Sequence, residues 1–186
     1  MRIRQRIARF ILRRLGWTCL DIESRPQRAV LVAYPHTSNW DFPLGLLVRA
    51  ALGLEIRWAG KDTLFRGPFG PLMRWLGGIP VNRREPAGLV ERLAAELRAG
   101  PPCLLAIAPE GTRSLTPGWK TGFHRIARAA GVPIVIGTID YGRRRIGLLA
   151  TLEPGADIDA DLAALAACYQ GCRGLRPERA APVRRR

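Results

Sequence analysis

The chain contains two histidines, and one of them lies in a sequence context that suits acid–base chemistry. His36 follows an apolar run at residues 29–34, and Asp41 comes five residues later. In a loop between a strand and a helix, a carboxylate at this spacing turns back and accepts a hydrogen bond from one imidazole nitrogen. The other nitrogen is then free to act as a base. In the alternative interpretation Asp41 only caps the helix and His36 is a loop residue. His124, within an expected helix, is interpreted as structural.

A second polar cluster, residues 109–114, follows the apolar run at residues 103–108. Gly111 lets the backbone approach a ligand closely, Thr112 offers a hydroxyl, and the Arg113 guanidinium matches the geometry of a phosphate. An ordinary polar turn is the alternative. Lys61 and Arg83 add two cations near the ends of further expected strands.

Several other catalytic templates are missing from the sequence. It has no Gly-x-Ser-x-Gly elbow, no Gly-x-x-x-x-Gly-Lys phosphate loop and no Gly-x-Gly-x-x-Gly dinucleotide fingerprint. Two histidines without a supporting cluster of Cys or carboxylate side chains also argue against a catalytic metal site. We therefore expect neither a metal nor a bound cofactor.

The rest of the sequence alternates between apolar runs typical of strands and amphipathic stretches typical of helices. Strands are expected near residues 29–34, 55–59, 79–82, 103–108, 133–139 and 146–152, and helices near 41–52, 71–76, 86–99, 122–130 and 161–169. Strands separated by helices of this length predict an α/β domain with a mostly parallel central sheet flanked by helices. Sites in such folds lie beyond the carboxyl ends of the strands, where His36 and residues 109–114 are expected.

The N-terminal residues 1–20 are interpreted as a basic amphipathic helix. Apolar side chains fall on one helical face, and arginines occupy much of the remainder. The pattern favours an interfacial helix that lies on a membrane, and the alternative is a terminal helix packed on the core with solvated arginines. Residues 21–172 are expected to form the main domain, and residues 173–186 a basic, disordered tail.

Composition narrows the classes of partner. The chain has 30 Lys and Arg against 15 Asp and Glu, a net charge of +15, which indicates nucleic acid, an anionic membrane or phosphorylated substrates. All basic residues except Lys61 and Lys120 are arginines. Codon bias is an alternative explanation for this excess of arginine over lysine. Aromatic residues are not interleaved with the basic runs, so specific nucleic-acid binding is not expected. No apolar run reaches the roughly 20 residues that span a bilayer, we expect no signal peptide, and the four cysteines are expected to be buried free thiols.

Residues 36–41, His-Thr-Ser-Asn-Trp-Asp, resemble the His-x4-Asp motif of the glycerolipid acyltransferases, whose best-known members acylate 1-acyl-glycerol-3-phosphate. Three further blocks follow in the order of that family. They are residues 61–65 through 77–83, the Pro-Glu-Gly-Thr-Arg-Ser of residues 109–114, and the Val-Pro-Ile-Val of residues 132–135. The resemblance covers about residues 29–140 and identifies a short form of the family.

The resemblance implies acyl transfer from an acyl-CoA or acyl carrier protein thioester to the hydroxyl of a lysophospholipid, in phospholipid biosynthesis. His36 would take the proton of the acceptor hydroxyl and return it to the leaving thiolate, and Asp41 would orient His36. The acceptor phosphate would lie among Lys61, Arg83, Gly111, Thr112 and Arg113. Glu110 is expected in a supporting role, holding an arginine or an acceptor hydroxyl.

The sequence departs from the family pattern at Pro35, Ala108 and Ile136, where Asn, Phe and a second Pro are common. The departures leave the catalytic pair intact and leave the acceptor open, so that another lysophospholipid or a lyso-aminolipid also fits. Two further functions compete with acyl transfer: a thioesterase with water as acceptor, and a non-enzymatic basic protein that binds nucleic acid or membrane. Because the acceptor is a lipid, the protein is expected in the cytoplasm, peripherally attached to the anionic inner face of the membrane.

Overall fold

A computed structural model describes residues 3–82 and 88–186. One seven-stranded sheet forms its centre, with the spatial order β1-β7-β6-β2-β5-β3-β4. The strands are β1 (Thr18–Leu20), β2 (Ala29–Tyr34), β3 (Ile56–Lys61), β4 (Gly78–Val81), β5 (Leu104–Ile107), β6 (Ile134–Asp140) and β7 (Arg145–Leu152). The helices are α1 (Ile3–Arg14), α2 (Asp41–Leu52), α3 (Gly70–Trp75), α4 (Leu89–Ala99), α5 (Gly122–Ala130) and α6 (Ile158–Cys168), with short 3₁₀ turns η1 (Asp62–Phe65) and η2 (Pro177–Arg179).

The sheet is mostly parallel, as the alternation of strands and helices predicts. Strands β2 to β6 run in one direction. β7 is antiparallel to β6, and β1 pairs in parallel with β7 at the sheet edge. The three-residue strand β1 was not expected, because it is too short to carry an alternating pattern of its own.

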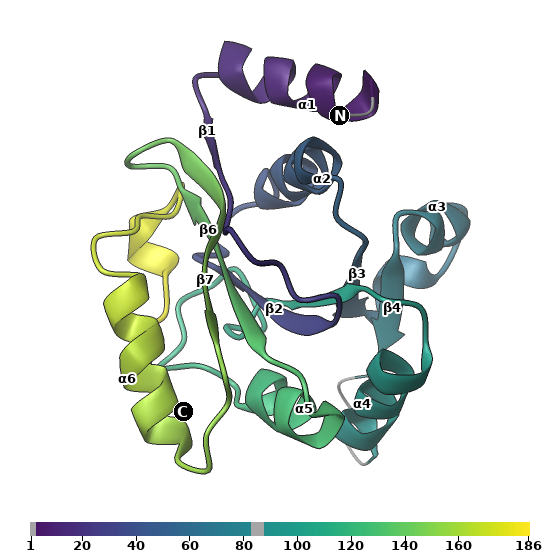
Figure 1. Cartoon of the computed structure of the whole chain (residues 1–186), viewed down its shortest axis with the longest axis vertical. Helices are drawn as coiled ribbons and strands as arrows, with labels where there is room; N and C mark the ends of the chain where they lie inside the picture. The colour runs from purple at the N-terminus through teal and green to yellow at the C-terminus, as the bar shows by residue number, and fades with distance from the viewer. Residues whose placement is uncertain (1–2, 83–87) are drawn as a thin grey trace.

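Helices cover both faces of the sheet (Figure 1). On one face, Ala8 and Leu12 of α1 join the apolar face of α2 and the sheet in one buried cluster. On the other face, α4, α5 and α6 form a second cluster. Because both faces are covered, the central strands are apolar along almost their whole length, and every residue of β6 is buried.

The strand register brings three chain segments to one edge of the sheet. β2 lies between β5 and β6, with Val32 opposite Ile107 and Tyr34 opposite Thr138. All three strands end at this edge, so the loops that follow them lie side by side. These loops begin at Pro35, Ala108 and Tyr141.

The expectation of a disordered tail over residues 173–186 is wrong. Ala181 is fully buried against the second core cluster, and Val183 packs on it. Trp119 donates its backbone N–H to the Arg184 carbonyl at 2.7 Å and accepts from the Arg186 N–H. The proline and arginine content predicts disorder, but this segment buries its small apolar side chains and pairs its backbone groups with the domain.

The N-terminal helix α1, within residues 1–20, packs on the core with part of its apolar surface. Ala8 and Leu12 are buried against α2, and the Arg9 side chain donates to the Ala51 carbonyl of α2 at 3.0 Å. Most of its remaining apolar side chains stay exposed, namely Ile3, Ile7, Phe10 and Ile11, and Leu15 directly after the helix is also exposed. α1 therefore packs on the core with one face and presents a second apolar face outward.

Candidate active site

His36 and Asp41 meet in the loop between β2 and α2. The Nδ1 atom of His36 lies 3.1 Å from Oδ2 of Asp41, whose carboxyl group is buried while the imidazole is partly exposed. An ionised carboxylate only accepts hydrogen bonds, so this contact places the proton of the neutral imidazole on Nδ1. Nε2 is then left with a free lone pair and can act as a general base.

Asp41 is held by two further donors. The Ser38 N–H donates to Oδ2 at 2.9 Å, and the hydroxyl of Tyr141 donates to Oδ1 at 2.9 Å. Trp40, not Asp41, occupies the N-cap position of α2, and it makes no side-chain cap hydrogen bond. The interpretation of Asp41 as an ordinary helix cap is therefore wrong, because its carboxylate turns back toward the loop.

Tyr141 follows β6 directly and was not singled out from the sequence. Burial, and next the hydrogen bond to Asp41, raise the pKa of Tyr141 well above its ordinary value, so the phenol keeps the proton that it donates. The signal that could have identified it is its position. It follows a strand whose carboxyl end neighbours that of β2, but the sequence does not specify that neighbour.

Glu110 supports the loop from the other side. Its Oε2 accepts the backbone N–H of His36 at 2.7 Å, and its Oε1 accepts the backbone N–H of Ala181 at 2.9 Å. Burial raises the pKa of Glu110, although these two hydrogen bonds lower it in part. The carboxylate binds backbone groups, whereas an arginine or an acceptor hydroxyl was expected as its partner.

Residues 111–113 lie next to the same loop. The Arg113 side chain donates from Nε to the Ser38 carbonyl at 3.2 Å, which places its guanidinium beside the histidine loop. Gly111 has a φ of 69°, a left-handed conformation that strains other residues. Thr112 and Arg113 are exposed to solvent. A phosphate could therefore reach this turn from outside.

The other predicted residues occupy different places. Lys61 ends β3 at the same edge of the sheet, one strand beyond β5, and is exposed. Arg83 lies outside the described residues. His124 is buried in α5 with its Nε2 2.8 Å from Oδ2 of Asp161 in α6, which agrees with its structural interpretation.

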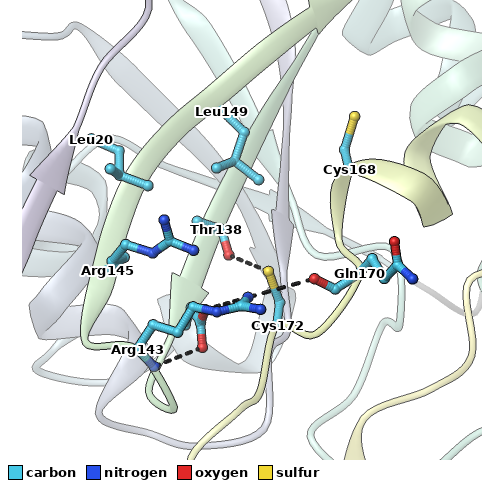
Figure 2. A pocket seen from close by; sticks show the side chains of 9 residues that line it. Leu20, Thr138, Arg143, Arg145, Leu149, Cys168, Gln170 and Cys172 are labelled. Atoms are coloured by element: carbon cyan, nitrogen blue, oxygen red, sulfur yellow. Dashed lines mark hydrogen bonds and ion pairs between the residues drawn. The ribbon is translucent and has the colours of Figure 1, made fainter.

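A pocket of about 230 Å³ opens beside β7 and the end of α6, and it holds none of the predicted site residues. Figure 2 shows Thr138 pointing at Cys172. The Arg143 side chain donates to the Asp140 carboxylate at 3.3 Å and to the Gln170 carbonyl at 3.5 Å. Its lining residues are Leu20, Thr138, Asp140, Arg143, Arg145, Leu149, Cys168, Gln170 and Cys172.

The four cysteines are free, but Cys168 is exposed and the others are only partly buried, so they are less buried than expected.

The described residues contain neither a cluster suited to a metal ion nor a helix suited to crossing a membrane. Across residues 3–82 and 88–186, no group of three His, Cys, Asp or Glu side chains is placed to hold a metal ion. Over the same ranges, no helix combines the length and the apolar character needed to cross a membrane.

Comparison with known proteins supports the chemistry that this geometry allows. No curated protein and no solved structure matches the chain. A family model described as Acyltransferase matches residues 16–139, more than half of the chain and the part that carries His36, Asp41 and Glu110. The resemblance seen in the sequence is thereby confirmed at the level of the family, and the chain belongs to the acyltransferase family.

Proposed function

We propose that this protein is an O-acyltransferase that moves a fatty acyl chain from a thioester to a hydroxyl of a lysophospholipid such as 1-acyl-glycerol-3-phosphate, in phospholipid biosynthesis. The donor is an acyl-CoA or an acyl carrier protein. The observation that supports this most directly is the contact of 3.1 Å between His36 Nδ1 and the buried Asp41 carboxylate. Membership of the acyltransferase family supports the reaction class, lipid acyl transfer.

The reaction that fits this geometry needs no covalent enzyme intermediate. Nε2 of His36 accepts the proton of the acceptor hydroxyl while that oxygen bonds to the thioester carbonyl carbon. The carbon–sulfur bond then breaks, and the imidazolium returns the proton to the leaving thiolate. Asp41 keeps the imidazole oriented and stabilises its positive charge. General-base assistance of this kind contributes about 10²- to 10⁴-fold in rate, and alignment of the two substrates adds to it.

An acyl-transfer assay with a panel of lyso-lipids tests the proposal. Free thiol is measured in parallel, with an acyl-CoA and an acyl carrier protein as donors. We expect thiol release that depends on one acceptor, and in His36→Ala a loss of about 10²- to 10⁴-fold in kcat with an unchanged fold. Asn39→Ala, an exposed residue of the same loop, is the matched control.

Three further outcomes separate the competing functions. Thiol release that needs no acceptor identifies a thioesterase. Full activity in a folded His36→Ala protein contradicts the mechanism. If neither donor releases thiol, the result favours a basic protein that binds nucleic acid or membrane without catalysis.

We place the acceptor phosphate at residues 111–113, with Lys61 and Arg83 as further cations. Arg113 is the residue whose guanidinium lies beside the histidine loop, and it is exposed.

Arg113→Ala is expected to raise the acceptor KM about 10-fold or more and to change the donor KM little, since it removes a charged hydrogen-bond donor. Arg125→Ala, which removes the same charge from an exposed position in α5, is the control. An unchanged acceptor KM in Arg113→Ala places the phosphate elsewhere or identifies an acceptor without one, such as a lyso-aminolipid.

We also propose that the protein acts at the anionic inner face of the membrane, as a peripheral protein of the cytoplasm. Two observations support this. α1 exposes an apolar face, and residues 1–20 carry arginines and no acidic side chain, so that anionic lipid would attract the same helix. We infer a second membrane contact at further exposed apolar side chains, namely Leu64 on η1, Phe69 directly before α3, Leu72 and Trp75 on α3, and Trp40 next to Asp41.

The elements that carry these side chains, α1 and α3, both lie beside helix α2, whose first residue is Asp41. α1 packs on α2 on one side. On the other side, Arg49 of α2 donates to the carbonyl of Leu76 directly after α3, at 2.8 Å. Between residues 56 and 81, Asp62 is the single acidic residue against four basic ones. A lipid acceptor could thus reach His36 from a membrane that contacts both sets of side chains.

A further inference from the structure

The chain beyond residue 139 lies outside the part that the family model matches, yet it contacts the histidine loop at several points. These contacts come from Tyr141 and from the C-terminal segment, residues 173–186. They reach the loop in three places: the Asp41 carboxylate, the Thr37 side chain and, through Glu110, the His36 backbone.

The first contact is the hydroxyl of Tyr141, which donates to Oδ1 of Asp41 at 2.9 Å. The tyrosine itself is held on two sides. Its ring packs edge-on against Trp17 with a centroid distance of 5.0 Å, and its backbone N–H donates to the Arg173 carbonyl at 2.8 Å. The donor to Asp41 is thus positioned by the first residue of the C-terminal segment.

The second contact runs through Glu110. This buried carboxylate accepts the His36 N–H with one oxygen and the Ala181 N–H with the other. Ala181 is itself fixed, since the Tyr34 hydroxyl donates to its carbonyl at 3.0 Å. The two residues on either side of Pro35 are therefore both linked to Ala181, Tyr34 through its side-chain hydroxyl and His36 through its backbone N–H and Glu110.

The third contact is at Thr37, which is 1 % exposed. Its hydroxyl accepts the backbone N–H of Arg176 at 3.2 Å. Gly174 lies directly against the same side chain, and a Cβ at Gly174 would be 2.4 Å from the Thr37 Oγ1 atom. The segment therefore packs on the loop too closely to admit any larger residue at position 174.

We infer that Tyr141 and the C-terminal segment form a positioning element that fixes His36 and Asp41 for the transfer step. The inference rests on the proposed function. A loop that carries a general base contributes to rate only when its nitrogen is aligned, and a displacement of about 1 Å can cost about 100-fold. This element restrains the loop at both residues of the pair, and its hydrogen bonds to the Asp41 carboxylate, the Thr37 hydroxyl and Glu110 do not involve the Arg113 guanidinium. Its loss is therefore expected to lower kcat and leave the acceptor KM unchanged.

Tyr141→Phe tests the contact to Asp41. It removes one hydroxyl that donates to a carboxylate, and kcat should fall about 10- to 100-fold. Tyr169→Phe is the matched control, because its buried hydroxyl donates only to the Val32 and Gly137 carbonyls, away from the loop. Equal kcat values in the two variants would overturn the role of Tyr141.

Gly174→Ala tests the C-terminal segment. The added methyl group pushes the segment off Thr37, and kcat should fall about 10-fold or more with an unchanged acceptor KM. Gly122→Ala adds the same methyl group where no atom lies within 4 Å, and it should keep the parental kcat. If Gly174→Ala does not fold, Thr37→Val, which removes only the acceptor of the Arg176 N–H, takes its place. A parental kcat in the folded variant overturns the role of the segment.

A measurement independent of activity separates this inference from the proposed function. ¹⁵N spectra of the imidazoles at about pH 8 report which nitrogen carries the proton, and His124 serves as an internal reference. In the parent, His36 should hold its proton on Nδ1. In Tyr141→Phe and Gly174→Ala, a mixture of both tautomers is expected for His36 and no change for His124. If the parent transfers no acyl group but the tautomers respond in this way, the proposed function fails and the positioning element stands. Unaltered His36 tautomers in both variants overturn the positioning element.

Discussion

At the scale of single residues, the site depends on side chains that bind the backbone of the histidine loop as well as on the pair itself. Asp41 receives three donors: the His36 ring, the Ser38 N–H and the Tyr141 hydroxyl. The buried Glu110 carboxyl group accepts two backbone N–H groups, those of His36 and Ala181. Carboxylates that are this well satisfied hold a loop in one conformation, because releasing them would leave buried donors unpaired.

Glu110 leads to a prediction about the pH dependence of stability. Burial raises its pKa above the ordinary 4.5, so the folded protein binds this proton more tightly than the unfolded chain does. The stability that results is fully present below the unfolded pKa and is lost as the pH rises through the raised value. The Tm difference between parent and Glu110→Gln should therefore shift against the parent as the pH rises from about 4 to 7.

Thermal unfolding of the two proteins across this range checks the prediction. Glu178→Gln, which alters an exposed glutamate, should show no such trend relative to the parent. A Tm difference that is flat for Glu110→Gln, or that shifts in the parent's favour as the pH rises, contradicts the assignment.

At the scale of elements, α1 has two apolar faces, of which one is buried on α2 and the other is exposed. Ala8 and Leu12 are buried on α2, so the helix is fixed to the domain. Ile3 is 76 % exposed, and Ile7 and Phe10 are more than half exposed. The hydrophobic effect would drive these side chains into a lipid surface, where their burial contributes about 1.5–3 kcal/mol each.

Ile7→Asp and Trp75→Asp are expected to weaken binding to anionic vesicles, each by about 10-fold, because each replaces an exposed apolar side chain, which the membrane would bury, by a charge. Co-sedimentation with vesicles that contain phosphatidylglycerol measures the effect. Ala164→Asp, an exposed position on α6, makes a similar change on a helix outside the proposed surface. Parental binding of Ile7→Asp would exclude α1 from the contact, and parental binding of Trp75→Asp would exclude α3.

At the scale of the whole molecule, the net charge of +15 acts on every anionic partner. Electrostatic attraction alone gives binding that falls steeply with salt, for DNA as well as for lipid. A membrane protein of the proposed kind adds the burial of apolar side chains, which salt does not screen.

Salt titration is therefore expected to separate the two partners. Between about 50 and 500 mM NaCl, binding to duplex DNA should be lost, while binding to anionic vesicles should fall and then level off at a residual value. Vesicles of neutral lipid should bind at that residual level at all salt concentrations. Equal loss on DNA and vesicles would indicate that charge alone carries the membrane contact.

The fold and the pair of site residues could be predicted for a common reason. The alternation of apolar runs and amphipathic stretches reflects contacts that each element makes within a few residues, and the strands β2, β5, β6 and β7 lie within a residue or two of their expected positions. His36 and Asp41 are also local, since one short loop joins them. Asp157 caps α6, since its side chain accepts the N–H groups of Asp159 and Ala160.

Contacts between distant parts of the chain could not be predicted in this way. The composition of residues 173–186 predicts disorder because prolines and arginines outnumber the apolar side chains, whereas burial of Ala181 depends on a core that other elements build. The short strand β1 depends on β7 in the same way.

The sequence by itself therefore determined the α/β class, the family and the neighbouring pair His36 and Asp41, because short-range patterning and one loop suffice for them. The tertiary structure decided what holds that pair. Tyr141 reaches Asp41 across 100 residues, and Ala181 reaches Glu110 across 71. Both contacts exist because β6 and β5 flank β2 in the sheet, and strand order is set by the packing of the whole domain, not by the pattern of any one segment.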